Sequence, residues 1–181
     1  MATLVVYRAD NLDNPAKLLT HFDDVQAELA RVSLRLHHHP VEELSGAVGT
    51  LEHLPQALLL GLRALYPEHD WPHVELYARD AIPVYATASV ETAEQEHCHP
   101  EAGLRYFLQG GGILCLRLAD EVLALGCEPG DVIELPAGSR HWFSPRPGED
   151  LLLVRLSASS AGLLVEPTGD PIARKIQLPD L

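Results

Sequence analysis

The chain has 181 residues, of which 46% are hydrophobic and 22% charged, so its composition excludes a disordered or fibrous protein. Its 13 basic and 26 acidic residues leave a net charge of −13, which disfavours nucleic acid and membrane surfaces as partners. The apolar run at 57–60 is far shorter than the ~20 residues of a membrane span. Three cysteines without framework spacing favour a reducing compartment, so we expect a cytoplasmic protein. Two lysines against eleven arginines are typical of a GC-rich bacterial genome.

The first half of the chain predicts helices followed by short strands. Apolar residues recur at about 3.6-residue spacing over 13–36, which predicts one long amphipathic helix with Asn14-Pro15 as its cap and first turn. A second helix is predicted over about 52–66, closed by Pro67. Residues 74–88 contain β-branched and aromatic side chains and predict short strands.

The second half of the chain has the pattern of an antiparallel β protein. Between residues 96 and 156, short apolar runs alternate with Gly, Pro and charged residues about every ten positions. This spacing predicts a sandwich or small barrel as the core of the domain. The tail over 166–181 is rich in Pro and Asp, and we expect it to wrap around the outside.

Three histidines form the clearest candidate for chemistry. His97 and His99 are two residues apart, so on a strand both imidazoles point to one face while Cys98 points away. His141 follows 42 residues after His99 and can supply a third imidazole from a neighbouring strand. Three ligands on one side of a metal leave open positions for a substrate and oxygen, as in non-haem iron oxygenases. The alternative is three unrelated histidines at strand ends.

The residues around these histidines resemble the two motifs of the cupin superfamily. The resemblance rests on the His97-Cys98-His99 segment with Gly110, and on Gly130, Pro136 and Gly138 before His141. It implies a double-stranded β-barrel, or jelly roll, preceded by N-terminal α-helices, with Gly130 and Gly138 in turns. We therefore expect one cupin domain over 1–181, with an extension over 1–88, a metal-binding barrel over 89–160 and a tail over 161–181.

Within the cupins, the chain resembles the acireductone dioxygenases of methionine salvage, which use iron or nickel. The resembling segments are EHCH, LRYFLQGGG, CEPGDVIELPAGSRHWF, VRL and TGDPIA. The resemblance implies that His97, His99 and His141 bind one divalent metal, Fe(II) or Ni(II). It also implies that Arg105 and Phe143 line the substrate pocket and that the substrates are a small molecule and O₂.

One family ligand has no counterpart in this chain. The family has a glutamate four residues after the second histidine, where this sequence has Gly103. Glu101 has the matching strand parity and is the nearby carboxylate that could replace it. The family's late GWVA segment is Gly-Leu-Leu-Val over 162–165, which suggests a reshaped pocket.

The missing carboxylate affects which substrate we expect. A divalent ion held by three neutral imidazoles keeps its +2 charge, whereas a glutamate ligand would leave about +1. Such a centre favours an anionic donor such as a thiolate, and three histidines are also the ligand set of the cupin thiol dioxygenases. We therefore expect O₂-dependent oxidation of a small thiol such as cysteine, with Arg105 holding the substrate carboxylate.

Two other functions remain open from the sequence. The first is an acireductone dioxygenase in which Glu101 serves as the fourth ligand. The second is a cupin that binds a metal or a small ligand without catalysis, because a fold does not fix a function. The sequence leaves the oligomeric state open.

Several further residues are candidates of lower rank. Glu96 adjoins a proposed ligand and is either the acceptor of a ring N–H in the catalytic site or exposed. Arg105 is either a catalytic and substrate-binding residue or part of a structural ion pair. His37, His38 and His39 are expected at a solvated helix end. Cys98, Cys115 and Cys127 are expected to be small buried side chains.

Overall fold

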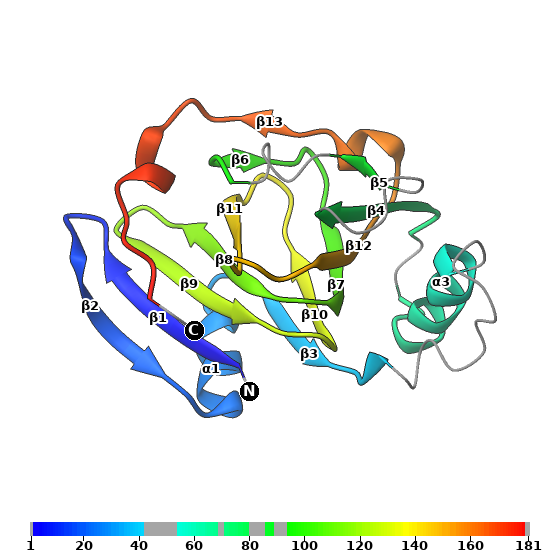
Figure 1. The fold of residues 1–181 in the computed structure, drawn as a ribbon, viewed down its shortest axis with the longest axis horizontal. Helices are drawn as coiled ribbons and strands as arrows, with labels where there is room; N and C mark the ends of the chain where they lie inside the picture. The colour runs from blue at the N-terminus through cyan, green and yellow to red at the C-terminus, as the bar shows by residue number, and fades with distance from the viewer. Residues whose placement is uncertain (1, 42–53, 69–70, 80–85, 89–93, 180–181) are drawn as a thin grey trace.

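The computed structural model describes residues 2–41, 54–68, 71–79, 86–88 and 94–179. Within these residues, no helix is long and apolar enough to cross a membrane. Most of the regular structure is β-strand, arranged in two sheets (Figure 1).

The first sheet has seven strands in the order β13-β6-β11-β8-β9-β1-β2. Their bounds are Glu166–Pro167, His97–Cys98, Arg140–Pro145, Gly112–Arg117, Glu121–Cys127, Thr3–Arg8 and Asn11–Leu19. The second sheet has six strands in the order β3-β10-β7-β12-β4-β5. Their bounds are Arg35–His38, Asp131–Leu135, Gly103–Gln109, Leu151–Ser157, His73–Arg79 and Ala86–Ala88. The described pairs are antiparallel except β4 with β5. Strands from the first 88 residues therefore complete both sheets.

The hydrophobic core lies between the two sheets and continues on their outer faces. A central cluster joins Leu114 of β8 to Phe107 of β7 and Leu153 of β12. Alternate residues on the same strands point outward: Tyr106 packs in a second cluster with residues of α3, and Cys115 packs in a third with the C-terminal tail. Both faces of these central strands are thus covered, which explains why they are almost continuously apolar.

The long helix predicted over 13–36 is wrong. The segment forms the end of β2, the helix α1 (Phe22–Ala30) and the strand β3. Leu18 and Leu19 pair with Val5 and Leu4 of β1, so sheet pairing outweighs the helical spacing of these residues. Pro15 lies in β2 at the edge of the sheet, where a strand tolerates a residue without an N–H donor.

The other predicted elements correspond more closely to the structure. The second helix, α3, spans Leu54–Leu65, within the predicted range; residues 52 and 53 lie outside the described residues. The predicted strands over 74–88 are β4 and β5, and residues 80–85 also lie outside the described residues. The tail forms β13 and the 3₁₀ turn η3 (Pro171–Arg174), and Ile172 and Ile176 pack against the first sheet.

The mostly-β fold class is therefore confirmed. The described residues contain two α-helices, α1 and α3, which are separated by β3 rather than forming an N-terminal helical block. The strands pair within two separate sheets, so a closed barrel remains a prediction, as does the division of the chain into three segments.

Candidate metal centre

The three predicted histidines meet at one end of the inter-sheet space. His97 lies on β6 and pairs directly with His141 on β11, and His99 follows two residues after His97. One ring nitrogen from each histidine lies within 4.8 Å of the others, and all three side chains are buried. The ring centroids are 4.3 to 5.2 Å apart. The strand parity expected from the sequence thus brings the three imidazoles together.

Backbone carbonyls fix the orientation of all three rings. The Nδ1 atoms of His97, His99 and His141 lie 2.7, 2.6 and 2.8 Å from the carbonyl oxygens of Gln95, Leu164 and Ser139. Because a carbonyl oxygen only accepts, each Nδ1 carries the proton and the acceptor lone pair of each ring lies on Nε2. This is the arrangement by which proteins prepare histidines to bind a metal. The donor set therefore fits a divalent transition metal.

Burial keeps the three imidazoles neutral. Burial is the largest effect, and together with the charge of Arg105 it lowers the pKa of His97 to about 4 and that of His99 to about 3. The same two effects lower the pKa of His141 well below the ordinary value. Neutral imidazoles at neutral pH are the form that binds a metal ion.

A small pocket opens beside His97 and His141. Arg105 and Phe143, both expected in the substrate pocket, line it together with Tyr77, Phe107, Leu153 and Arg155. The ring of Phe143 packs 5.4 Å from that of Phe107. One polar side and one aromatic side make this pocket suitable for a small polar molecule with an apolar part.

Arg105 is a buried cation in direct contact with a histidine. Its Nη2 atom lies 2.8 Å from Nε2 of His141, and its side chain is 8% exposed. Burial, and then the nearby charge of Arg155, lower the pKa of Arg105 to about 9. The inward orientation expected from strand parity is therefore present.

Two functional candidates were missed by the sequence analysis. Arg155 of β12 lies directly opposite Arg105 of β7, and its Nη2 is 3.0 Å from Nε2 of His99. Glu75 of β4 pairs with Arg155 on the other side at 2.9 Å. An arginine two residues after Leu153 in an otherwise apolar strand was the available signal, because the alternation places both side chains between the sheets.

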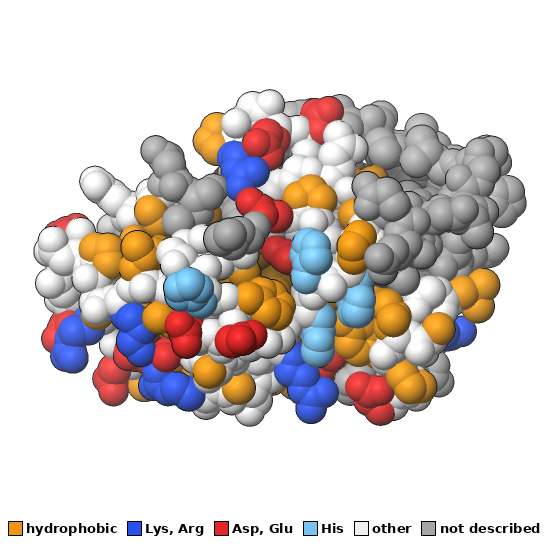
Figure 2. Space-filling model, turned by 90° about the horizontal axis from the view of Figure 1, so that it is seen from below, with side chains coloured by type: hydrophobic (Ala, Val, Ile, Leu, Met, Phe, Trp, Pro, Cys, Tyr) orange, Lys and Arg blue, Asp and Glu red, His pale blue; other side chains and the backbone are white. Residues whose placement is uncertain are grey.

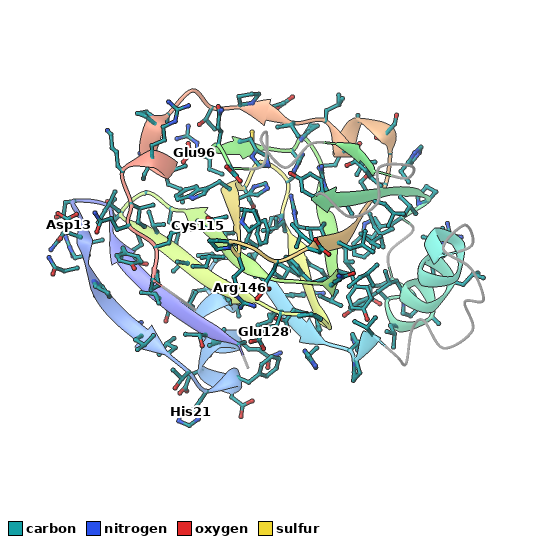
Figure 3. All side chains as sticks on the ribbon, viewed as in Figure 1. Asp13, His21, Glu96, Cys115, Glu128 and Arg146 are labelled. Carbon is teal, nitrogen blue, oxygen red and sulfur yellow. The ribbon has the colours of Figure 1, made fainter. Side chains whose placement is uncertain are left out.

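Glu96 takes neither of its two expected roles. Its carboxylate is fully buried and accepts a 2.5 Å hydrogen bond from the Thr168 hydroxyl, with Arg117 at 3.5 Å. Glu96 directly precedes His97 in the chain, and neighbouring residues of a strand point to opposite faces, so its side chain points away from the imidazoles. Figure 3 shows Glu96 beside β6, near the C-terminal tail. Glu96 therefore attaches the tail to the strand that carries His97.

In the structure the carboxylate of Glu101, the expected replacement ligand, faces Ser159 and not the three histidines. Glu101 is not part of the three-histidine group, and its carboxylate accepts hydrogen bonds from Ser159 at the start of the 3₁₀ turn η2 (Ser160–Leu163). Glu101 borders the same pocket as His99 and His141, but its carboxylate is bonded to this turn. Gly103, where the family has its glutamate, lies at the start of β7 and borders a pocket shared with His99 and His141.

Among the residues that the structure describes, the remaining histidines and cysteines lie outside this group. His37 and His38 are on β3, not at a helix end, and His38 contacts Asp131 at 2.9 Å. The rings of His37 and His39 pack on Tyr66, and Figure 2 shows histidines beside hydrophobic side chains on one face. Figure 3 places His21 far from Glu96. Cys115 and Cys127 are buried as expected, whereas Cys98 is only partly buried.

Two packed β-sheets with three convergent imidazoles define a metal-binding protein of the cupin type. Residues 84–162 match the ARD/ARD' family. The chain is 30% identical over 178 residues to an acireductone dioxygenase of Pseudomonas paraeruginosa, covering 98% of both chains. It is 31% identical over 173 residues to an acireductone dioxygenase of Pseudomonas fluorescens, covering 96% of both.

A solved structure supports the fold. An acireductone dioxygenase from Bacillus anthracis with a cadmium ion in its active centre matches with a TM-score of 0.71 and 15% identity. The match covers 91% of this chain and 97% of the other.

This chain belongs to the acireductone dioxygenase family, whose members are metal-dependent cupin dioxygenases. The predictions of a metal-dependent dioxygenase and of one divalent transition metal, Fe(II) or Ni(II), are confirmed. The predicted preference for a thiol has no support among these relatives.

Proposed function

We propose that this protein is a dioxygenase of a small enediol, an acireductone or a close analogue, with His97, His99 and His141 as the protein ligands of its metal. The observation that carries this proposal is the orientation of the three rings. Each Nδ1 is held by a backbone carbonyl, so the three Nε2 atoms converge, in a chain related to acireductone dioxygenases over 98% of its length.

The bound metal supplies a centre at which an anionic enediolate and O₂ can lie side by side. The protein's own contribution is to orient and neutralise the substrate. The guanidinium groups of Arg105 and Arg155 border the pocket and can donate to enediolate oxygens. Phe107 and Phe143 cover the apolar side of the pocket and exclude water from it. Glu75 holds Arg155 in place through their ion pair.

The proposal includes no carboxylate ligand. Glu101 is bonded to Ser159, and Gly103 has no side chain, so the centre keeps a higher positive charge than one with a glutamate. This charge favours an anionic substrate. An enediolate meets this requirement as a thiolate does, and the relatives favour the enediolate.

The wider expectations also remain part of the proposal. We infer a single cupin domain over 1–181 with a jelly-roll barrel, acting in the cytoplasm on a small molecule and O₂. The acidic net charge supports the absence of nucleic-acid and membrane partners.

Oxygen uptake by protein loaded with Fe(II) or Ni(II) tests the proposal. An acireductone should cause rapid uptake, while cysteine and other small thiols should cause none. His141→Ala should abolish uptake, and His38→Ala should retain it, because His38 lies on β3 outside the centre. Uptake with thiols alone would restore the thiol dioxygenase prediction. Metal binding without uptake on either class would favour a non-catalytic cupin.

A further inference from the structure

Arg105 differs from the other arginine of the pocket in its charge balance. Arg155 has an ion pair with Glu75 at 2.9 Å. Among the described residues, no carboxylate forms an ion pair with Arg105, which is 8% exposed and lies opposite Arg155 in the sheet. A buried charge is costly unless an opposite charge or hydrogen bonds compensate it. The positive charge of Arg105 is therefore not compensated by a carboxylate of the described residues, and a bound anion would stabilise it.

The hydrogen bond that Arg105 does form uses a nitrogen of the proposed metal centre. Its Nη2 lies 2.8 Å from Nε2 of His141. Arginine is a donor without an acceptor lone pair, so the guanidinium donates and Nε2 accepts. Nε2 has one lone pair, which cannot serve a guanidinium and a metal ion at once. If His141 is a metal ligand, as the proposed function states, Arg105 and the metal compete for the same lone pair.

We propose that Arg105 couples metal binding to anion binding: its guanidinium occupies Nε2 of His141 while no anion is present, and a small anionic ligand draws it away and frees this nitrogen for the metal. Repulsion between the guanidinium and a divalent ion also weakens metal binding while no anion is present. An anion between the two cations relieves this repulsion. The protein thereby binds its metal most tightly when an anionic ligand is also present.

The pocket indicates the chemistry of this anion. A guanidinium binds a planar carboxylate, or two oxygens of an enediolate, through parallel hydrogen bonds. Phe107 and Phe143 form the aromatic side of this pocket, and because the pocket is small the anion must be small as well. A small oxyanion such as a hydroxy acid or an enediolate fits this description.

The test measures Ni²⁺ affinity with free Ni²⁺ set by a competing chelator, in the presence of glycolate or of glycolamide. Glycolamide has nearly the same size and hydroxyl group but no charge. We expect glycolate to raise the Ni²⁺ affinity of the wild-type protein about tenfold or more, within the range typical of coupled sites, and glycolamide to have little effect.

The Arg105→Met variant distinguishes competition from simple support of the site, because the two predict opposite changes in Ni²⁺ affinity. It removes the donor that competes with the metal at His141, while Arg155 keeps its contact with Nε2 of His99. The variant should therefore raise Ni²⁺ affinity in the absence of anion and abolish the effect of glycolate. A residue that only supported the site would lower Ni²⁺ affinity when replaced. Arg8→Met is the matched control, since it removes one positive charge from an exposed ion pair with Asp10 at the end of β1. Arg8→Met should have the same Ni²⁺ affinity as the wild-type protein, both with glycolate and without it.

A second measurement needs no variant. Binding is reciprocal, so Ni²⁺ should raise the glycolate affinity of the wild-type protein by the same factor as glycolate raises Ni²⁺ affinity. Equal effects of glycolate and glycolamide, or weaker Ni²⁺ binding by Arg105→Met without anion, would overturn the coupling. If the wild-type protein binds Ni²⁺ and His141→Ala does not, the metal centre stands even when the coupling fails. If the wild-type protein binds no Ni²⁺, both fail together.

Discussion

Glu101 and Ser159 are joined by two hydrogen bonds: Oε2 of Glu101 accepts the backbone N–H of Ser159 at 3.0 Å, and Oε1 accepts its hydroxyl at 2.6 Å. Ser159 in turn caps the 3₁₀ turn η2 by accepting from the N–H of Ala161. The carbonyls of Leu163 and Leu164, at the end of this turn, hold Arg155 and His99. Glu101 therefore acts on the centre at a distance, through the backbone.

Glu101→Ala should destabilise the protein and keep its metal. The change leaves the Ser159 donors without their partner, which costs about 1–3 kcal/mol of the free energy of unfolding. Denaturant unfolding together with metal analysis measures both effects. Ser159→Ala should cause part of the same loss, and the double variant should lose less than the sum of the two, because both changes break one contact. Loss of metal from Glu101→Ala would return Glu101 to the ligand set.

Two substitutions of Gly103 distinguish the packing cost of a side chain from the effect of a carboxylate on metal binding. A Cβ atom at this position would lie 3.0 Å from the carbonyl oxygen of Leu156, so Gly103→Ala should lower the free energy of unfolding by about 1 kcal/mol. Gly103→Glu should show the same packing cost and bind Ni²⁺ more tightly than Gly103→Ala, because it adds a carboxylate near the three histidines. Equal Ni²⁺ affinities of the two variants would show that a side chain at this position does not reach the metal.

The buried histidines predict how the stability of the metal-free protein depends on pH. Burial holds the pKa of His97 at about 4 and that of His99 at about 3 in the folded protein, below about 6.5 in the unfolded chain. Between these values the unfolded chain binds more protons, so the free energy of unfolding falls as pH decreases below about 6.5. Each histidine contributes up to about 1.4 kcal/mol per pH unit.

Urea unfolding of metal-free protein at several pH values from 5.0 to 6.5 measures this slope, above the main range of carboxylate titration. His99→Gln should reduce the slope, because glutamine does not titrate. A stability that stays constant across this range, or rises as pH falls, would show that the imidazoles are protonated in the folded protein.

The sequence predicted the metal centre better than the elements around it. Strand parity was enough to bring His97, His99 and His141 together, because alternation is a property of any strand. The helix predicted over 13–36 failed because Leu18 and Leu19 satisfy both a helical period and the pairing with β1, and only the tertiary partner decides between them. The ion pair of Arg155 with Glu75 joins residues 80 positions apart, so no local pattern indicates it.

The orientations of the three histidine rings could also be predicted only where the contact is local in the sequence. His97 and His141 donate to carbonyls two residues earlier, which a local pattern could suggest. His99 donates to Leu164, which is 65 residues away on the far side of η2. This contact depends on the path of the tail, which no local pattern in the chain indicates.

The metal content of single-histidine variants tests the central claim most directly. Purified wild-type protein and His38→Ala should each hold about one Ni²⁺ or Fe²⁺ per chain after loading and desalting, because His38 contacts Asp131 and not the centre. His97→Ala, His99→Ala and His141→Ala should each lose most of this metal, since two imidazoles form an incomplete ligand set. Full metal occupancy in His141→Ala would contradict the three-histidine centre.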